Sequence, residues 1–146
     1  MRLTSEQKTE KRLNCVLEIN RLCFPSVRAS DEKMTHLFNT GEVFFDIYRN
    51  AILGFAVCEQ FTFETPRLVI IAVLLDYQGQ GVGKKLLAEV IEHYKSAGCM
   101  SLELVVNTKN ARAIRMYKAA GFMIDKTLKK YFLQDGDGYL MRREYE

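Results

Sequence analysis

The sequence predicts an α/β fold in one domain, residues 1–146, in which helices and strands alternate. Two observations predict it. The nearly all-apolar run Leu68–Leu75 is typical of a central strand covered on both faces. Apolar residues at helical spacing between Val82 and Gly98 predict a long amphipathic helix. No linker, repeat or low-complexity tract interrupts the chain, and its length suffices for a substantial core.

The first half of the chain has two helix signals followed by a hairpin signal. Apolar residues at near-helical spacing predict a helix over Glu10–Phe24, ended by Pro25. A second, shorter helix is expected over Asp31–Phe38, with its aspartate as cap. The segments Val43–Tyr48 and Ile52–Phe63 are rich in β-branched and aromatic residues, so we expect them to pair as a hairpin.

The second half continues the alternation. Its expected elements are the strand Leu68–Leu75, the helix Val82–Gly98, the strand Ser101–Val106, the helix Asn110–Ala120 and the closing strands Phe122–Phe132 and Tyr139–Arg143. Gln134–Gly138 joins the closing strands. Its aspartates lack the spacing and the terminal glutamate of a calcium loop, so we expect a tight turn.

A glycine-rich segment, Gln78–Lys84, lies between the apolar run and the long helix. Gly79, Gly81 and Gly83 have no Cβ, so the backbone there can adopt special conformations and approach a ligand closely. Amides in the first turn of a helix lack intrahelical partners and lie at the positive end of its dipole. The segment therefore predicts a phosphate or pyrophosphate site. Its glycine spacing fits neither a Walker A loop nor the dinucleotide-binding fingerprint.

A second motif occupies residues 110–122, after the expected strand Ser101–Val106. Asn110 suits a helix N-cap, and Gly121 suits a left-handed helix stop. Ile114 and Tyr117 share one face of the helix between them. An amphipathic helix with good caps would also explain the motif taken by itself.

Taken together, the two segments resemble the GNAT N-acetyltransferase family over nearly the whole chain. Residues 78–83 match the pattern Q/R-x-x-G-x-G/A, and residues 110–122 match N-x-x-A-I-x-x-Y-x-x-x-G-F at every named position. The resemblance implies the family's fold, a mixed and mostly antiparallel sheet of six to seven strands with about four helices. It also implies acetyl-CoA as cosubstrate and no metal.

The resemblance further implies roles for individual residues. The backbone of Val73–Leu75 would pair with the pantetheine arm of acetyl-CoA, which Asn110 would also contact. Tyr117 would direct its hydroxyl at the CoA sulfur as general acid. The expected cofactor-binding residues are Val73, Leu75, Gln78, Gly79, Gln80, Gly81, Val82, Gly83, Lys84, Asn110 and Tyr117.

The sequence names no general base. Glu103 alternates with apolar residues on its expected strand, and we expect it to face solvent rather than substrate. Glu42, Glu59 and Glu64 are further candidates, which the sequence does not rank. A carboxylate or a water relay would ordinarily serve this step.

The tail Lys129–Met141 and the segment Arg21–Pro25 resemble one branch of the family, the protein N-terminal acetyltransferases, which include ribosomal-protein-alanine enzymes. This partial resemblance implies a peptide acceptor and makes Tyr131 a candidate substrate-binding residue. Two positions depart from the branch: Ser26-Val27 replaces a Trp-Ser pair, and the branch's glutamate falls on Val105.

Three functions therefore remain open. The acceptor is a protein or peptide N-terminal amine, or a small amine such as a polyamine, an amino acid or an aminoglycoside. The third possible function is that of a non-catalytic acyl-CoA-binding module. The lack of an identified general base favours this function, and the presence of Tyr117 disfavours it.

Composition narrows the partners and the compartment. A net charge of +3 without a long Lys/Arg block gives no indication of nucleic-acid binding. The 4 cysteines have no C-x-x-C spacing, so we expect buried free thiols in a reducing compartment and no zinc site. No signal sequence or membrane-spanning run is recognisable. We expect a cytoplasmic protein without a membrane partner, either monomeric or homodimeric.

Overall fold

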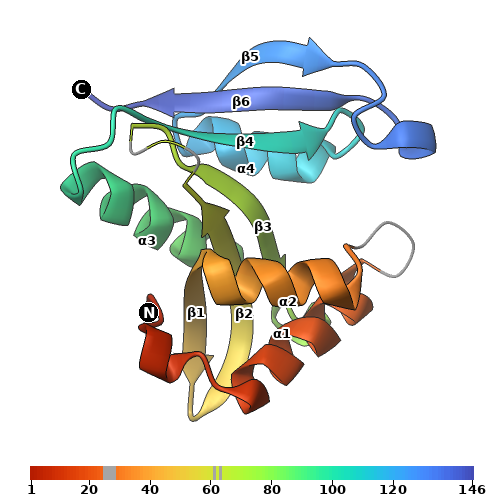
Figure 1. The fold of residues 1–146 in the computed structure, drawn as a ribbon. Helices are drawn as coiled ribbons and strands as arrows, with labels where there is room; N and C mark the ends of the chain where they lie inside the picture. Colours follow the sequence, from red (N-terminus) through yellow and green to blue (C-terminus); the bar gives the residue numbers. More distant parts are fainter. Residues whose placement is uncertain (25–28, 61, 63) are drawn as a thin grey trace. The chain divides into compact units, whose positions relative to one another are not determined.

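The structure is a computed structural model that describes residues 1–24, 29–60, 62 and 64–146. The first half contains α1 Glu10–Cys23, α2 Asp31–Thr40, β1 Glu42–Tyr48 and β2 Ala51–Glu59 (Figure 1). The second half contains β3 Arg67–Val73, α3 Val82–Ser96, β4 Ser101–Asn107, α4 Ala111–Ala119, β5 Met123–Leu128 and β6 Gly138–Glu144. Short 3-10 helices cover Ser5–Gln7, Leu75–Tyr77 and Leu133–Asp135. The predicted alternation of helices and strands is confirmed.

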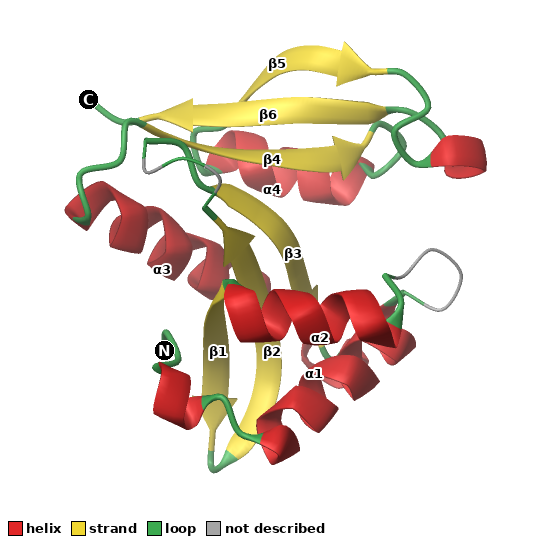
Figure 2. Ribbon diagram, viewed as in Figure 1, coloured by secondary structure: helices red, strands yellow, loops and turns green. Residues whose placement is uncertain are grey.

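The strands of the described residues form one mixed sheet in the order β1-β2-β3-β4-β6-β5 (Figure 2). The β1–β2, β4–β6 and β5–β6 pairs are antiparallel. β3 and β4 pair in parallel, with Arg67 opposite Glu103 and Leu68 opposite Leu104. This is the mixed, mostly antiparallel sheet that the family resemblance implied.

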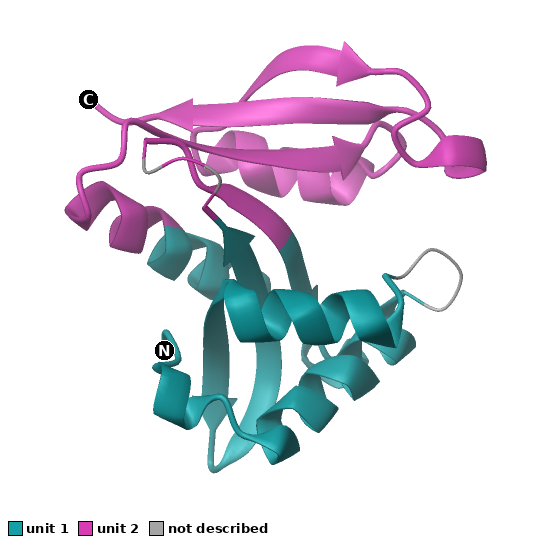
Figure 3. Ribbon diagram, viewed as in Figure 1, with its two compact units in different colours: residues 1–59, 70–90 teal, residues 60–69, 91–146 magenta. Residues whose placement is uncertain are grey.

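The chain divides into two compact units, residues 1–59 with 70–90 and residues 60–69 with 91–146 (Figure 3). In the first unit, α1 and α2 contact β2, and the buried core includes Val16, Ile19, Met34, Phe38, Phe44 and Phe55. The core of the second unit includes Tyr94, Leu102, Leu104, Tyr117, Phe122 and Met141. Each unit thus has buried aromatic residues of its own.

Some predicted boundaries differ from the structure for local reasons. The N-cap of α2 is Ser30, whose side chain accepts a hydrogen bond from the Lys33 amide, rather than Asp31. β5 ends at Leu128 instead of continuing to Phe132, because Lys130 and Leu133 have positive φ angles of 54° and 55° and a strand cannot include them. Pro25 and the predicted end of β2 at Phe63 lie outside the described residues.

The prediction that Leu68–Leu75 forms a central strand covered on both faces is only partly confirmed. β3 lies between β2 and β4, as predicted for a central strand. It ends at Val73, because Leu75 begins a 3-10 turn, and Leu68 and Ala72 are its buried residues. The three residues 69–71 are half-buried, so the expectation of two fully covered faces was wrong. A continuous apolar run shows apolar composition and does not by itself show complete burial.

Candidate active site

The glycine segment forms an exposed turn at the start of α3. Gly79 and Gly81 have φ angles of 77° and 86°, a left-handed region that favours glycine. A Cβ added to Gly81 would meet nothing within 4 Å, so its face of the turn is open. Gly83 lies inside the first turn of α3, where the Lys85 amide donates to the Gly81 carbonyl at 2.9 Å.

The charges of the side chains in the first turn of α3 are unusual for the N-terminal end of a helix. Helices ordinarily favour acidic side chains in their first turn because of the helix dipole. The first turn of α3 has none and instead carries Lys84 and Lys85, both exposed. Open amides, the dipole and two lysines all favour an anion at this position. The residues therefore fit the pyrophosphate that the sequence predicted.

The side chain of Gln78 does not point at the expected pyrophosphate position at the start of α3. Its Nε2 donates to the Val73 carbonyl at 3.0 Å, which ties the turn to the end of β3. The thiol of Cys23, the last residue of α1, donates to the same carbonyl at 3.1 Å. Burial raises the pKa of the Cys23 thiol, while the bond to Val73 opposes that shift. Neither contact could be read from the sequence.

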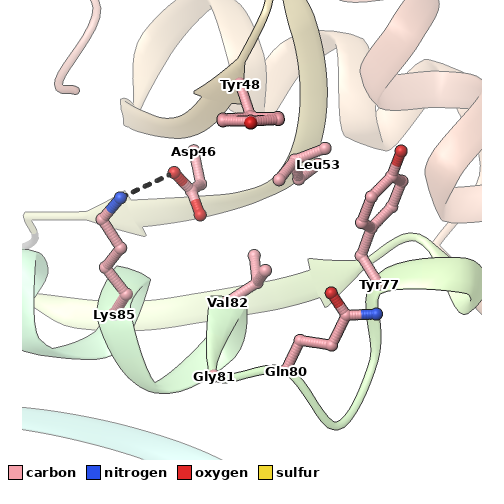
Figure 4. A pocket seen from close by; sticks show the side chains of 8 residues that line it. All are labelled: Asp46, Tyr48, Leu53, Tyr77, Gln80, Gly81, Val82 and Lys85. Atoms are coloured by element: carbon pink, nitrogen blue, oxygen red, sulfur yellow. Dashed lines mark hydrogen bonds and ion pairs between the residues drawn. The ribbon is translucent and has the colours of Figure 1, made fainter.

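A cavity of about 320 Å³ lies on the side of the turn that faces the β1–β2 hairpin (Figure 4). Its lining includes Leu53 and Val82 as apolar walls and the Tyr77 ring. Asp46, whose side chain is only 11% exposed, accepts a hydrogen bond from the 75% exposed Lys85 at 3.2 Å. Lys85 is thus paired, which leaves Lys84 as the lysine of this turn with no partner among the described residues.

The second motif lies in the other unit, on α4. Asn110 is the N-cap, and its Oδ1 accepts a hydrogen bond from the Ala113 amide at 3.1 Å, as predicted. Its side-chain nitrogen has no partner among the residues the structure describes, so it can still donate to a ligand. The helix ends before Gly121, which has a φ angle of 97°.

Tyr117 is buried at 7% exposure, and its ring packs edge-on against Phe122 with centroids 5.9 Å apart. Burial raises the pKa of Tyr117 to about 12, so the phenol is protonated at neutral pH. Within the described part of the chain, the hydroxyl has no hydrogen-bond partner. A core tyrosine ordinarily satisfies its hydroxyl, so this one suits a donor kept for a ligand.

Glu103 does not face solvent as expected. Its side chain is 12% exposed, and its Oε1 accepts hydrogen bonds from Arg67 at 2.7 and 3.0 Å. Its Oε2 accepts one from Arg142 at 3.3 Å. The expectation was wrong because alternation along β4 shows which face a side chain lies on and not what covers that face. With both oxygens bound by guanidinium groups, Glu103 is a poor candidate for the base.

The other predicted positions occupy varied surroundings. Tyr131 is 47% exposed and packs edge-on against Phe132, in the turn that follows β5. Val105, where the N-terminal acetyltransferase branch has glutamate, is a half-buried residue of β4 opposite Leu140.

Glu42 pairs with Arg2 at 3.4 Å, whereas Glu64 uses its backbone carbonyl to accept from the Met100 amide. None of these carboxylates is thereby distinguished as a base.

The cysteines at 15, 23, 58 and 99 form no disulfide, and Cys58 and Cys99 are buried whereas Cys15 and Cys23 are half-buried. No group of three or more His, Cys, Asp and Glu side chains that could hold a metal occurs among the residues described. Among those same residues, no helix has the length and apolar character needed to cross a bilayer.

The fold defines the class of the protein, which is that of the acetyltransferases. The chain belongs to the acetyltransferase (GNAT) family, whose family model matches residues 13–122. It is therefore a GNAT-family N-acetyltransferase, related to ribosomal-protein and protein N-terminal acetyltransferases.

Individual relatives agree with this assignment. The chain is 32% identical over 106 residues to the ribosomal-protein-bS18-alanine N-acetyltransferase of Escherichia coli, covering 71% of each protein. The crystal structure of that species' ribosomal-protein-alanine enzyme aligns with a TM-score of 0.84 at 25% identity, over 93% of this chain and 89% of that one. A GNAT acetyltransferase from Elizabethkingia anophelis, crystallised with acetyl-CoA bound, aligns with a TM-score of 0.78 at 26% identity, over 88% and 89% of the two chains.

Proposed function

We propose that residues 1–146 act as one domain that transfers an acetyl group from acetyl-CoA to a primary amine, and that this amine is a protein or peptide N-terminus. The observation that carries the proposal is the turn before α3. Gly79 and Gly81 are left-handed and exposed there, and the helix begins with lysines instead of acids. This combination favours a bound anion.

Each predicted residue has a role in this proposal. The amides of residues 78–84 and the Lys84 ammonium would hold the pyrophosphate, and the backbone of Val73 and Leu75 would bind the pantetheine arm. The free side-chain nitrogen of Asn110 would donate to the same arm. When bound, acetyl-CoA supplies a thioester carbonyl that a neutral amine attacks with loss of the thiolate. Placing donor and amine together supplies much of the rate.

Tyr117 would act mainly by hydrogen bonding. Its pKa of about 12 lies well above that of an ordinary thiol, about 8.5. Complete proton transfer to the departing thiolate would cost on the order of 5 kcal/mol at that difference. A hydrogen bond from the buried phenol to the developing charge carries no such cost, because the proton stays on oxygen. Tyr117 is therefore assigned as the donor that stabilises the leaving sulfur.

Two observations support a peptide acceptor over a small amine. The similar proteins include enzymes named for acetylating the alanine of a ribosomal protein. The turn after β5 also presents the Tyr131 ring at the surface, braced by Phe132. An exposed and braced aromatic side chain provides rigid contact area for a peptide.

Calorimetry with acetyl-CoA, followed by assays of CoA release, tests the proposal. The acceptor panel pairs each peptide that has a free N-terminus with the same peptide formylated at that end, and adds a polyamine and an aminoglycoside. We expect turnover with free peptides alone. Turnover with the small amines alone would replace the peptide acceptor, binding without any turnover would indicate a non-catalytic module, and no binding would overturn the proposal.

A further inference from the structure

The carbonyl of Val73 faces the edge of β3 away from β2. The Leu74 amide donates to the Leu53 carbonyl of β2 at 2.9 Å, and the Ala72 carbonyl lies against Gly54 of the same strand. Successive backbone groups of a strand point to opposite edges. The Val73 carbonyl, between these two residues, therefore points to the opposite edge, where the proposed pantetheine contact would be made.

The Val73 carbonyl oxygen already accepts two hydrogen bonds. It accepts from Gln78 Nε2 at 3.0 Å and from the Cys23 thiol at 3.1 Å, and a carbonyl oxygen has two lone pairs. The two donors differ in strength. The Gln78 amide is an ordinary donor from the adjoining turn, whereas a thiol is a weak donor. Cys23 also reaches Val73 from a separate element, the end of α1.

We propose that the Cys23 thiol occupies the place of a pantetheine amide on the Val73 carbonyl, so that acetyl-CoA must displace this thiol in order to bind. The inference rests on the proposed function. One N–H donor replaces one S–H donor, and no bond is formed or broken covalently. Burial raises the pKa of the Cys23 thiol, which favours its protonated, donating form. Cys23 is therefore a residue that sets the affinity for the cosubstrate.

The order of affinities in two variants tests this competition. Cys23→Ala removes the competing donor, so acetyl-CoA should bind about twofold to tenfold more tightly than to the wild type. Cys23→Ser substitutes a stronger donor and should bind acetyl-CoA more weakly than the wild type. If Cys23 only supported the end of β3, serine would preserve the affinity and alanine would reduce it. That reversed order, or equal affinities in all three proteins, would overturn the inference.

Two controls isolate the contact. Cys15, another half-buried cysteine of α1, has no described contact with Val73, so Cys15→Ala and Cys15→Ser should leave the affinity unchanged. Adenosine 3′,5′-bisphosphate lacks the pantetheine amides, so its binding should not differ among the Cys23 variants. Thermal unfolding checks that each variant is folded. Failure of the wild type to bind acetyl-CoA would reject the proposed function itself, whereas binding with the wrong order rejects only the competition.

Discussion

In the proposed function, the turn before α3 would bind acetyl-CoA through its backbone, whereas the helix α4 would act through its side chains. The turn offers backbone amides in an exposed segment whose conformation depends on Gly79 and Gly81. The helix offers two side chains, the capping Asn110 and the buried Tyr117. Binding through backbone amides depends on the conformation of the backbone, whereas a contact made by a side chain depends on individual side-chain atoms. Variants can separate the two.

The largest effect is expected from removing one atom on α4. Tyr117→Phe should lower kcat about 100-fold, because it deletes the donor to the leaving sulfur. Acetyl-CoA affinity should stay within about twofold, since the ring and its packing on Phe122 remain. Steady-state kinetics with the best acceptor, together with calorimetry, measure the two effects. An unchanged kcat would remove Tyr117 from the mechanism.

The pH dependence of the wild-type rate tests the same residue. Burial raises the pKa of Tyr117 to about 12, so the phenol remains a donor at all lower pH values. The rate should therefore show no descending limb from this group below about pH 10, the ordinary tyrosine pKa. A descending limb near pH 9 that disappears in Tyr117→Phe would contradict the raised pKa.

The next largest effect is expected from a substitution that strains the backbone of the turn before α3. Gly81→Ala meets no steric contact but places a side chain at a φ angle of 86°, which costs about 1 kcal/mol and lowers acetyl-CoA affinity roughly fivefold. Gly98 is a matched control, because it has a φ angle of 83° and equally open space. Gly98→Ala should show the same loss of stability and no loss of affinity. Equal affinity losses in both variants would indicate a general effect of destabilisation.

Asn110 combines a structural and a binding role, which two substitutions can separate. Asn110→Ala should lower the free energy of unfolding by about 1 kcal/mol through loss of the N-cap, and Asn110→Ser should restore most of it. Neither variant retains the side-chain nitrogen, so both should bind acetyl-CoA more weakly than the wild type. Full affinity in the serine variant would leave Asn110 with the capping role alone.

The smallest expected effect concerns the turn that carries Tyr131. The Lys130 amide and the Lys129 ammonium bind Asp137 and lower its pKa below the ordinary 3.8. This contribution to stability is present above pH 3.8 and is lost as the pH falls through the folded-state pKa. Asp137→Asn should thus unfold at a slightly lower temperature at pH 7, and its difference from the wild type should shrink in acid. A constant difference across pH would contradict this assignment.

Local sequence signals predicted most of the fold and the local conformations of the two motifs. Asn110 caps α4, the glycines at 79 and 81 take left-handed conformations, and the helix stop at Gly121 does the same. Each of these depends on residues close together in the chain, where propensity and capping rules apply. Boundaries that depended on neighbours in space, such as the full burial of β3, were predicted less well.

The sequence by itself determined the family, the order of elements and the two motifs, because these are encoded by residue type at short spacing. Tertiary structure alone decided that Cys23 reaches the carbonyl of Val73, 50 positions away, and that Glu103 binds Arg67 and Arg142 across 36 and 39 positions. It also decided that the Tyr117 side chain is buried and that its hydroxyl has no hydrogen-bond partner among the described residues. Such contacts depend on which elements pack together, and no local pattern of residues specifies that.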